Sequence, residues 1–174
     1  MHFRSERLDA ERHDLSTFSC GEPSLDAWLH EQAVPATARR TARTWVWTDQ
    51  DSTVVGYYAL AAHKVAREEI PAKMGRGGPT EIPAVLLARL ALTTPLRGQG
   101  LGEVLVADAL ARIVDATQIV AARLVVVDAV HQRVARFYET LGFHRVPGSL
   151  LLVQKIADIE IALSPAPPPS SDPT

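Results

Sequence analysis

The sequence has little of several features that define common protein classes. It contains one cysteine, Cys20, so no disulfide can form within the chain, which suits a reducing compartment. It shows no apolar run of the roughly 20 residues that a membrane-spanning helix needs, and we expect neither a signal peptide nor a membrane anchor. The net charge of −2 gives no overall attraction to nucleic acid, so such a partner would need a local basic patch. We therefore expect a cytoplasmic protein.

The composition is that of one folded domain followed by a short tail. The chain has 174 residues, of which 47% are hydrophobic, and this is enough for a sizeable core within residues 1–163. Proline and serine dominate Ser164–Thr174, which predicts a disordered tail. Cys20 has no base that the sequence would place beside it, so we assign it a structural role. We predict no metal site.

A central stretch reads as strand, glycine-rich loop and helix. Leu86–Leu92 is an apolar run interrupted only by Arg89, which is typical of a buried strand. Arg97–Gly102 then contains three glycines, and Leu101–Arg112 repeats its apolar residues at helical spacing. The same helix carries a polar stripe formed by Asp108, Arg112 and Asp115. A glycine loop before a helix leaves backbone N–H groups unpaired in a positive potential, which predicts a phosphate or pyrophosphate site.

The glycine spacing decides which phosphate ligand is expected. The Walker pattern needs Lys followed by Ser or Thr, and the dinucleotide fingerprint needs a different glycine spacing. The pattern that fits is [RQ]-x-x-G-x-[GA], read as Arg97, Gly100 and Gly102. This stretch resembles the acyl-CoA loop of the GNAT N-acetyltransferase superfamily; the alternative is a flexible turn without a ligand. The resemblance implies acetyl-CoA contacts at Leu90, Ala91, Leu92, Arg97, Gly98, Gln99, Gly100, Leu101 and Gly102.

The remaining pattern predicts an α/β protein with a mixed sheet flanked by helices. The expected strands lie within His2–Leu8, Trp45–Thr48, Val54–Ala62, Leu86–Leu92, Arg123–Asp128, Phe143–Val146 and Leu150–Lys155. The expected helices start at a Ser24 cap, restart from Pro35 to Arg40, follow the glycine loop and span Gln132–Leu141, whereas Lys64–Pro83 is expected to be a surface loop or short helix. This order resembles the GNAT acyltransferase fold, which implies a central sheet splayed between its fourth and fifth strands.

A second motif supports the resemblance. Phe137–Phe143 reads FYETLGF, and FYExxGF is common in GNAT proteins, where the tyrosine meets the CoA sulfur. The resemblance therefore implies that Tyr138 is catalytic and protonates the leaving thiolate; the alternative is a tyrosine that only packs in the core. Many members carry Asn where this chain has His131, for which we favour a helix-start contact over a proton carrier.

The acceptor is inferred from amine chemistry. A lysine side chain has a pKa of about 10.4 and needs a base, but Leu86–Leu92 offers no carboxylate. An α-amine, with a pKa of about 7.7–8.0, needs far less help. Esterification of the neighbouring carboxyl lowers the pKa of that amine further, and aminoacyl-tRNA presents such an amine together with phosphates. The cations available for those phosphates are Arg39, Arg40, Arg43, Arg76 and Arg89. The alternative for Arg39–Arg43 is a solvated helix end, and for Arg89 an ion pair in the core.

Several short motifs are similar to those of TacT-type GNAT toxins of bacterial toxin–antitoxin modules. They are FxCG from Phe18, LDxWL from Leu25, RTxV from Arg43, VGYYAL from Val55 and RLA from Arg89, the last preceded by Ala88 instead of the usual glycine. The resemblance implies acetylation of the α-amine of aminoacyl-tRNA, a homodimer, and inhibition by a ribbon-helix-helix antitoxin. Two alternatives remain, namely a GNAT enzyme that acetylates a small amine or a protein N-terminus, and a non-catalytic CoA-binding protein.

Overall fold

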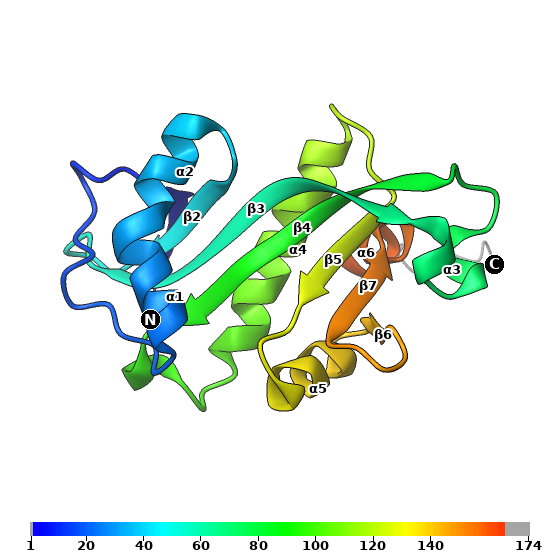
Figure 1. Cartoon of the computed structure of the whole chain (residues 1–174). Coiled ribbons are helices and arrows are strands. Elements are labelled where there is room, and N and C mark those ends of the chain that lie inside the picture. Colours follow the sequence, from blue (N-terminus) through cyan, green and yellow to red (C-terminus); the bar gives the residue numbers. More distant parts are fainter. Residues whose placement is uncertain (1, 166–174) are drawn as a thin grey trace, which may run out of the picture.

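A computed structural model describes residues 2–165 of the chain, and within them seven strands form one sheet (Figure 1). The strands are β1 (Arg4–Arg7), β2 (Arg43–Thr48), β3 (Val54–Ala66), β4 (Glu81–Leu92), β5 (Leu124–Asp128), β6 (His144–Arg145) and β7 (Leu151–Lys155). The helices are α1 (Pro23–Ala27), α2 (Ala33–Arg39), α3 (Ala72–Gly75), α4 (Leu101–Thr117), α5 (Gln132–Thr140) and α6 (Ile156–Leu163). Of the predicted tail, residues 166–174 lie outside the described part. No helix within residues 2–165 is both long and apolar enough to cross a bilayer.

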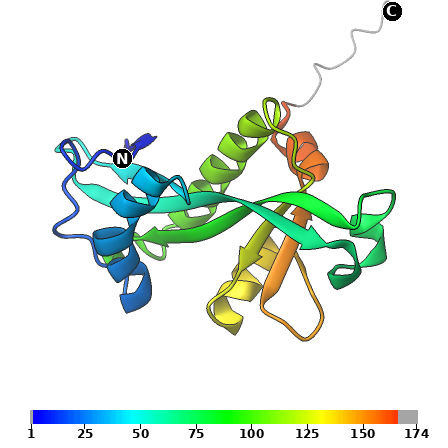
Figure 2. The same ribbon diagram turned by 45° about the horizontal axis from the view of Figure 1, so that its top comes forward.

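The sheet has the order β1-β2-β3-β4-β5-β7-β6 and is mixed, as predicted. All neighbouring strands run antiparallel except β4 and β5, which are parallel and joined by the crossover helix α4. Strands β2 and β3 form an antiparallel hairpin, in which Trp45 pairs with Tyr58. Strands β3 and β4 then continue as a long, twisted ribbon that extends well beyond the rest of the sheet (Figure 2).

Helices cover both faces of the sheet, and two adjacent tyrosines show how β3 separates them. Tyr57 points to the side of α1 and α2, where it packs with Phe18 and Leu29. Tyr58 points to the opposite side, where it packs with residues of α4 and α6. Both side chains are fully buried, and they face opposite ways because successive strand residues alternate. The two tyrosines therefore belong to separate hydrophobic clusters on the two faces of the sheet.

The parallel pair separates at one end because β4 contains an irregularity. The register of β3 with β4 shifts at Ala88, which has no partner between the pairs Ala59–Arg89 and Leu60–Leu87. Such a bulge bends a strand and increases its twist. Pairing with β5 ends at Leu86, so the stretch after it has a free edge on that side. The expected splay between the fourth and fifth strands is confirmed.

Two local predictions are wrong. The first helix is capped by Glu22 and not by Ser24, because Pro23 occupies the first turn, where its missing N–H is harmless. The helix does not restart after Pro35, which lies in the first turn of α2, directly after a π-helical turn that changes the hydrogen-bond spacing. The expected surface loop or short helix is confirmed over residues 67–80, which contain turns and the short helix α3. Only the two ends of the expected segment differ, because β3 runs on to Ala66 and pairs with the first residues of β4.

One helix was not expected. Helix α6 follows β7 directly and buries Ile156 and Ile159 against the core beneath α4. Its other large apolar residues, Ile161 and Leu163, are 74% and 43% exposed. Apolar side chains therefore occur around much of this short helix. Its sequence lacks the single apolar stripe by which an amphipathic helix is recognised.

The polar stripe on α4 joins a network that ties this helix to three strands. Asp108 Oδ2 accepts hydrogen bonds from the hydroxyls of Tyr58 (2.8 Å) and Ser5 (2.6 Å). Arg112 Nε donates to the Tyr58 oxygen (2.7 Å), and its guanidinium lies 3.6 Å from the centre of the Trp45 ring. Because α4 begins at the glycine loop, this network fixes the helix whose N-terminus forms the predicted phosphate site.

Candidate active site

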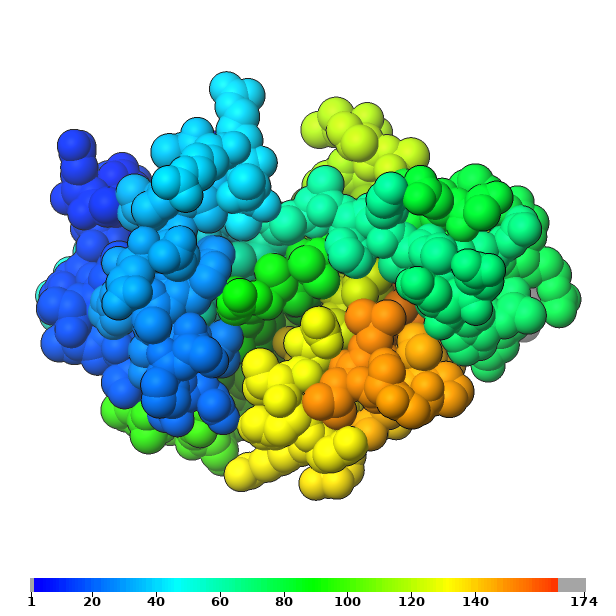
Figure 3. Space-filling model, viewed as in Figure 1, coloured from blue at the N-terminus to red at the C-terminus, as the bar shows by residue number. Residues whose placement is uncertain are grey.

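A cleft of about 440 Å³ opens where β4 and β5 separate. Its floor is formed by β4, one wall by the segment before α1, and the other wall by the end of β5 and by α5. Figure 3 shows the N-terminal helices (blue) and α5 (yellow) on either side of this hollow, with β4 (green) visible between them. The predicted residues that line it are Arg89, Leu90, Ala91, Leu92, Arg97, Gly98, Gly100, Gly102 and Tyr138. The strand, the glycine loop and the tyrosine of the two motifs therefore meet in one cleft.

The glycine loop has the geometry of an anion cradle. Gly98 and Gly100 have φ of +76° and +75°, a left-handed conformation that other residues adopt only with strain. No atom of the protein lies within 4 Å of where a Cβ would stand at either position, so the space above the loop is open. The first N–H groups of α4 begin directly after Gly100 and have no partner within the helix. These features fit a pyrophosphate.

Three loop side chains play different parts. The Arg97 guanidinium packs against Gly21, where an added Cβ would lie 3.5 Å from Nη1. Gln99 turns back and donates to the Pro95 carbonyl (3.1 Å), while Leu101 packs on the main core. Of these three predicted cofactor residues, only Arg97 lines the cleft.

The free edge of β4 fits an extended amide-containing chain. On one side, Tyr57, Gly56 and their neighbours pair with Leu90, Ala91 and Leu92. On the other side, pairing with β5 has already ended, so the backbone groups that alternate toward the cleft have no strand partner. A ligand with spaced amides binds such an edge as an added strand would. The pantetheine arm of CoA has this chemistry.

Tyr138 lies in α5 at the inner end of the cleft. It is only 4% exposed and packs edge-on against Phe137 and Phe143, with ring centroids 5.3 and 5.4 Å apart respectively. Its hydroxyl has no hydrogen-bond partner among the described residues, yet the side chain lines the cleft. Burial raises the pKa of the phenol above its usual value, so the group stays protonated at neutral pH. It is therefore suited to donate a proton to a thiolate.

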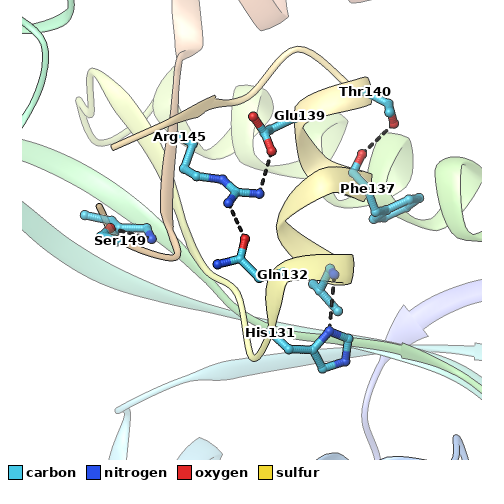
Figure 4. A network of polar contacts seen from close by, with 9 residues as sticks. His131, Gln132, Phe137, Glu139, Thr140, Arg145 and Ser149 are labelled. Atoms are coloured by element: carbon cyan, nitrogen blue, oxygen red, sulfur yellow. Dashed lines mark hydrogen bonds and ion pairs between the residues drawn. The ribbon is translucent and has the colours of Figure 1, made fainter. Parts of the chain in front are cut away.

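Polar contacts hold α5 in place (Figure 4). Arg145, from β6, donates to Glu139 Oε1 at 2.6 Å and also contacts the Gln132 side-chain oxygen. Because these partners lie at opposite ends of α5, one arginine fixes both ends of the helix that carries Tyr138.

His131 occupies the start of α5, which supports the favoured helix-start role. Its Nδ1 accepts the N–H of Val134 at 3.4 Å, as an N-cap side chain does. Its Nε2 lies 3.2 Å from Glu22 Oε1, across the cleft. Figure 4 shows the ring beneath the first turn of the helix.

The five arginines predicted for the acceptor do not come together. Arg89 lines the cleft, where its guanidinium lies 5.5 Å from the centre of the Trp28 ring and donates to the Ala88 carbonyl. It has no carboxylate partner among the described residues, which removes the alternative of a core ion pair. Arg39 and Arg40 are exposed at the end of α2, and Arg76 is exposed beyond α3, at the tip of the long ribbon. Arg43 donates to the Thr37 carbonyl of α2. These four do not line the cleft.

Sequence reasoning missed much of the wall that faces the glycine loop. Strand β5, α5 and the turn between them contribute Val127, Asp128, Val130, Arg133, Val134 and Phe137, and the segment at α1 contributes Glu22 and Leu25. The FYExxGF motif marks α5, so residues one turn before Tyr138 could have been included at helical spacing. No local signal identifies Glu22. Cys20 is fully buried and its pKa is raised to about 11, mainly by burial, so the structural assignment of this thiol is supported.

The geometry is that of a CoA-dependent acyltransferase, and comparison with known proteins gives the class. The acetyltransferase (GNAT) domain family matches residues 40–145, which is more than half of the chain. The chain therefore belongs to the GNAT acetyltransferase family, and acetyl-CoA is its cofactor. The predicted fold is confirmed.

Particular relatives are acetyltransferase toxins. The chain is 35% identical over 158 residues to the tRNA-acetylating toxin of Mycobacterium tuberculosis, covering 89% of this chain and 95% of that protein. AtaT complexed with acetyl-methionyl-tRNAfMet has a TM-score of 0.84 at 28% identity, covering 94% of this chain and 100% of that one. An AtaT mutant bound to acetyl-CoA and the C-terminus of the antitoxin AtaR has a TM-score of 0.79 at 27% identity, covering 94% and 99%.

Proposed function

We propose that this protein transfers the acetyl group of acetyl-CoA to the α-amine of an aminoacyl-tRNA and so acts as a translation-blocking toxin. The observation that carries the proposal is the cleft itself. Its floor, Leu87–Leu92 of β4, contains no carboxylate, and its buried end holds a phenol that stays protonated. This arrangement suits an amine that is already largely neutral. The likeness to a tRNA-acetylating toxin over most of both chains supports this acceptor.

Tyr138 is the group that donates and then recovers a proton during the reaction. Acetyl-CoA supplies the acetyl group as a thioester; the amine nitrogen forms the new bond to the carbonyl carbon as the carbon–sulfur bond breaks. Tyr138 donates its proton to the leaving sulfur and then recovers the proton that the nitrogen loses. The raised pKa favours the second transfer, because a buried phenolate is a strong base, while in the first transfer the protonated phenol can hydrogen-bond to the leaving sulfur as its negative charge develops.

Arg89 is the predicted acceptor residue with the best position. It lines the cleft, stacks on Trp28 and has hydrogen-bond donors beyond the one that contacts Ala88. It is therefore placed for a phosphate or ribose of the terminal nucleotide. Arg39, Arg40, Arg43 and Arg76 would meet phosphates farther along the acceptor arm, because tRNA extends well beyond a cleft of this size.

Partners follow from the same proposal. We expect inhibition by a ribbon-helix-helix antitoxin, action in the cytoplasm where charged tRNA is found, and assembly as a homodimer. The side chains of Trp45 and Trp47 face α4: the Arg112 guanidinium covers the Trp45 ring, and Trp47 stacks on Phe3. A dimer would therefore use another surface, and light scattering at micromolar concentration tests whether it forms.

Two experiments test the identity of the acceptor: competition between possible acceptors, and the dependence of acetyl transfer on salt concentration. Charged tRNA, a small amine and a peptide N-terminus are offered with acetyl-CoA, and transfer to charged tRNA should dominate. That transfer should fall steeply as salt rises, because phosphate contacts release counterions. The double change Arg39→Glu and Arg40→Glu should weaken transfer to tRNA and leave acetyl-CoA binding intact, since both side chains are exposed outside the cleft. Preferred acetylation of the small amine or the peptide would favour the general N-acetyltransferase alternative.

A further inference from the structure

Two side chains from opposite walls of the cleft meet at its mouth. Glu22 precedes α1, which packs on the β2–β4 half of the sheet, whereas His131 precedes α5, which packs against β6 and β7. Glu22 Oε1 and His131 Nε2 are 3.2 Å apart, and both residues line the cleft. Figure 3 shows the two walls approaching each other across the hollow, with β4 behind. This contact therefore joins the two halves of the sheet at the place where β4 and β5 no longer pair.

The backbone on the Glu22 side is held firmly. The Glu22 carbonyl accepts the N–H groups of Leu25 (3.0 Å) and Asp26 (3.1 Å) at the start of α1. Just before it, the Ser19 carbonyl accepts both the N–H and the hydroxyl of Thr94, each at 2.9 Å. Thr94 begins the turn that leads into the glycine loop. The position of Glu22 is thus tied to the loop that receives the pyrophosphate.

The hydrogen bonds on the other side fix the protonation pattern of the His131 ring. Nδ1 accepts the N–H of Val134, so in the neutral ring the hydrogen lies on Nε2. Nε2 therefore donates to Glu22, and the contact does not require a charged imidazole. One side chain therefore both caps α5 and contacts Glu22 across the cleft.

We infer that Glu22 and His131 form a strap that crosses the cleft mouth and holds the pantetheine arm of acetyl-CoA against β4. The free edge of β4 forms the back of the channel, the two walls form its sides, and the strap connects the walls. The inference rests on acetyl-CoA occupying this cleft and not on the identity of the acceptor. Glu22 and His131 are positioning residues, because they act on the residence of the cofactor and take no part in proton transfer.

The expected effect is modest, because the side chains of His131 and Glu22 are 44% and 38% exposed. Exposed pairs contribute little, and other charged residues share the cleft, namely Arg97, Glu103, Asp128 and Arg133. Loss of the strap should raise the dissociation rate of acetyl-CoA roughly two- to fivefold. Such a change is readily measured by displacement in a stopped-flow instrument.

Two changes remove the strap in different ways. Glu22→Ala removes the acceptor, while His131→Asn keeps a good N-cap but is too short to reach Glu22. Both should speed acetyl-CoA dissociation and raise the KM for acetyl-CoA more than they change kcat. Glu22→Gln keeps an oxygen acceptor for Nε2–H and should restore dissociation to within about twofold of the wild-type rate.

The matched control is an exposed ion pair that lies away from the cleft. Glu81 contacts Lys64 at 3.0 Å on the long ribbon, away from the cleft, so Glu81→Ala should leave dissociation unchanged. Unchanged dissociation in both Glu22→Ala and His131→Asn would overturn the strap, as would Glu22→Gln behaving like Glu22→Ala. Equal losses of melting temperature and cofactor retention in all variants, including the control, would indicate a purely structural effect and also overturn it. No acceptor is present in this assay, so its outcome is independent of the tRNA proposal.

Discussion

Gly100 offers a sharp test of the phosphate site, because Gly100→Asn and Gly100→Asp introduce side chains of almost the same size that differ in charge. Its φ of +75° is left-handed, and nothing lies within 4 Å of an added Cβ. A substitution therefore strains the backbone without creating a clash within the protein. Asn and Asp tolerate this conformation better than other side chains, for which the cost is about 1–2 kcal/mol. Gly100→Asn and Gly100→Asp should thus fold with similar melting temperatures.

The two variants should differ strongly in cofactor affinity. At roughly 6 Å and an effective dielectric constant of about 20, two unit charges repel by about 3 kcal/mol. The loop is exposed, so screening reduces this to about 1–2 kcal/mol, or roughly a five- to thirtyfold loss of affinity. Calorimetric titration with acetyl-CoA should therefore show that Gly100→Asp binds at least about fivefold more weakly than Gly100→Asn. Equal affinities of the two variants would show that no anionic group binds above this loop.

Three further predictions concern buried groups. Tyr138→Phe should keep acetyl-CoA binding and slow turnover by roughly ten- to ten-thousand-fold, the range of one acid–base group; wild-type turnover would leave the tyrosine a packing role. Asp108→Asn should destabilise the fold by about 1–3 kcal/mol in denaturant titrations, because three hydrogen bonds converge on this carboxylate, and an unchanged midpoint would contradict the network. Cys20 should resist alkylation at pH 8 in the folded protein. Because its pKa is raised to about 11 from 9.0, it contributes stability that is complete below pH 9 and lost as the pH rises to 11; fast labelling without unfolding would contradict this.

The sequence was most informative where one segment determines its own structure. The apolar run before the glycine loop predicted β4, and the loop predicted the start of α4, because glycines and helical periodicity are local signals. The alternation along β3 likewise placed Tyr57 and Tyr58 on opposite faces. The FYExxGF motif led to α5, and the structure places Tyr138 in the same cleft as the loop.

Features that depend on contacts between distant segments were not predictable in this way. The bulge at Ala88 depends on the register with β3, and the wall at Glu22 depends on how the first helix packs on the sheet. Arg89 has no local signal for its stacking on Trp28. The cluster of arginines in Arg39–Arg43 also did not indicate where these side chains lie relative to the cleft. In the structure they lie outside it.

The central claim is tested most directly by mass spectrometry of the amino acids linked to tRNA. Charged tRNA is incubated with acetyl-CoA and either the wild-type protein or Tyr138→Phe, and the aminoacyl adenosine at the 3′ end is released by nuclease digestion. We expect an added acetyl group on the α-amine with the wild-type protein and a strongly reduced amount with the variant. Unmodified charged tRNA, together with efficient acetylation of a free amine or a peptide N-terminus by the same preparation, would contradict it.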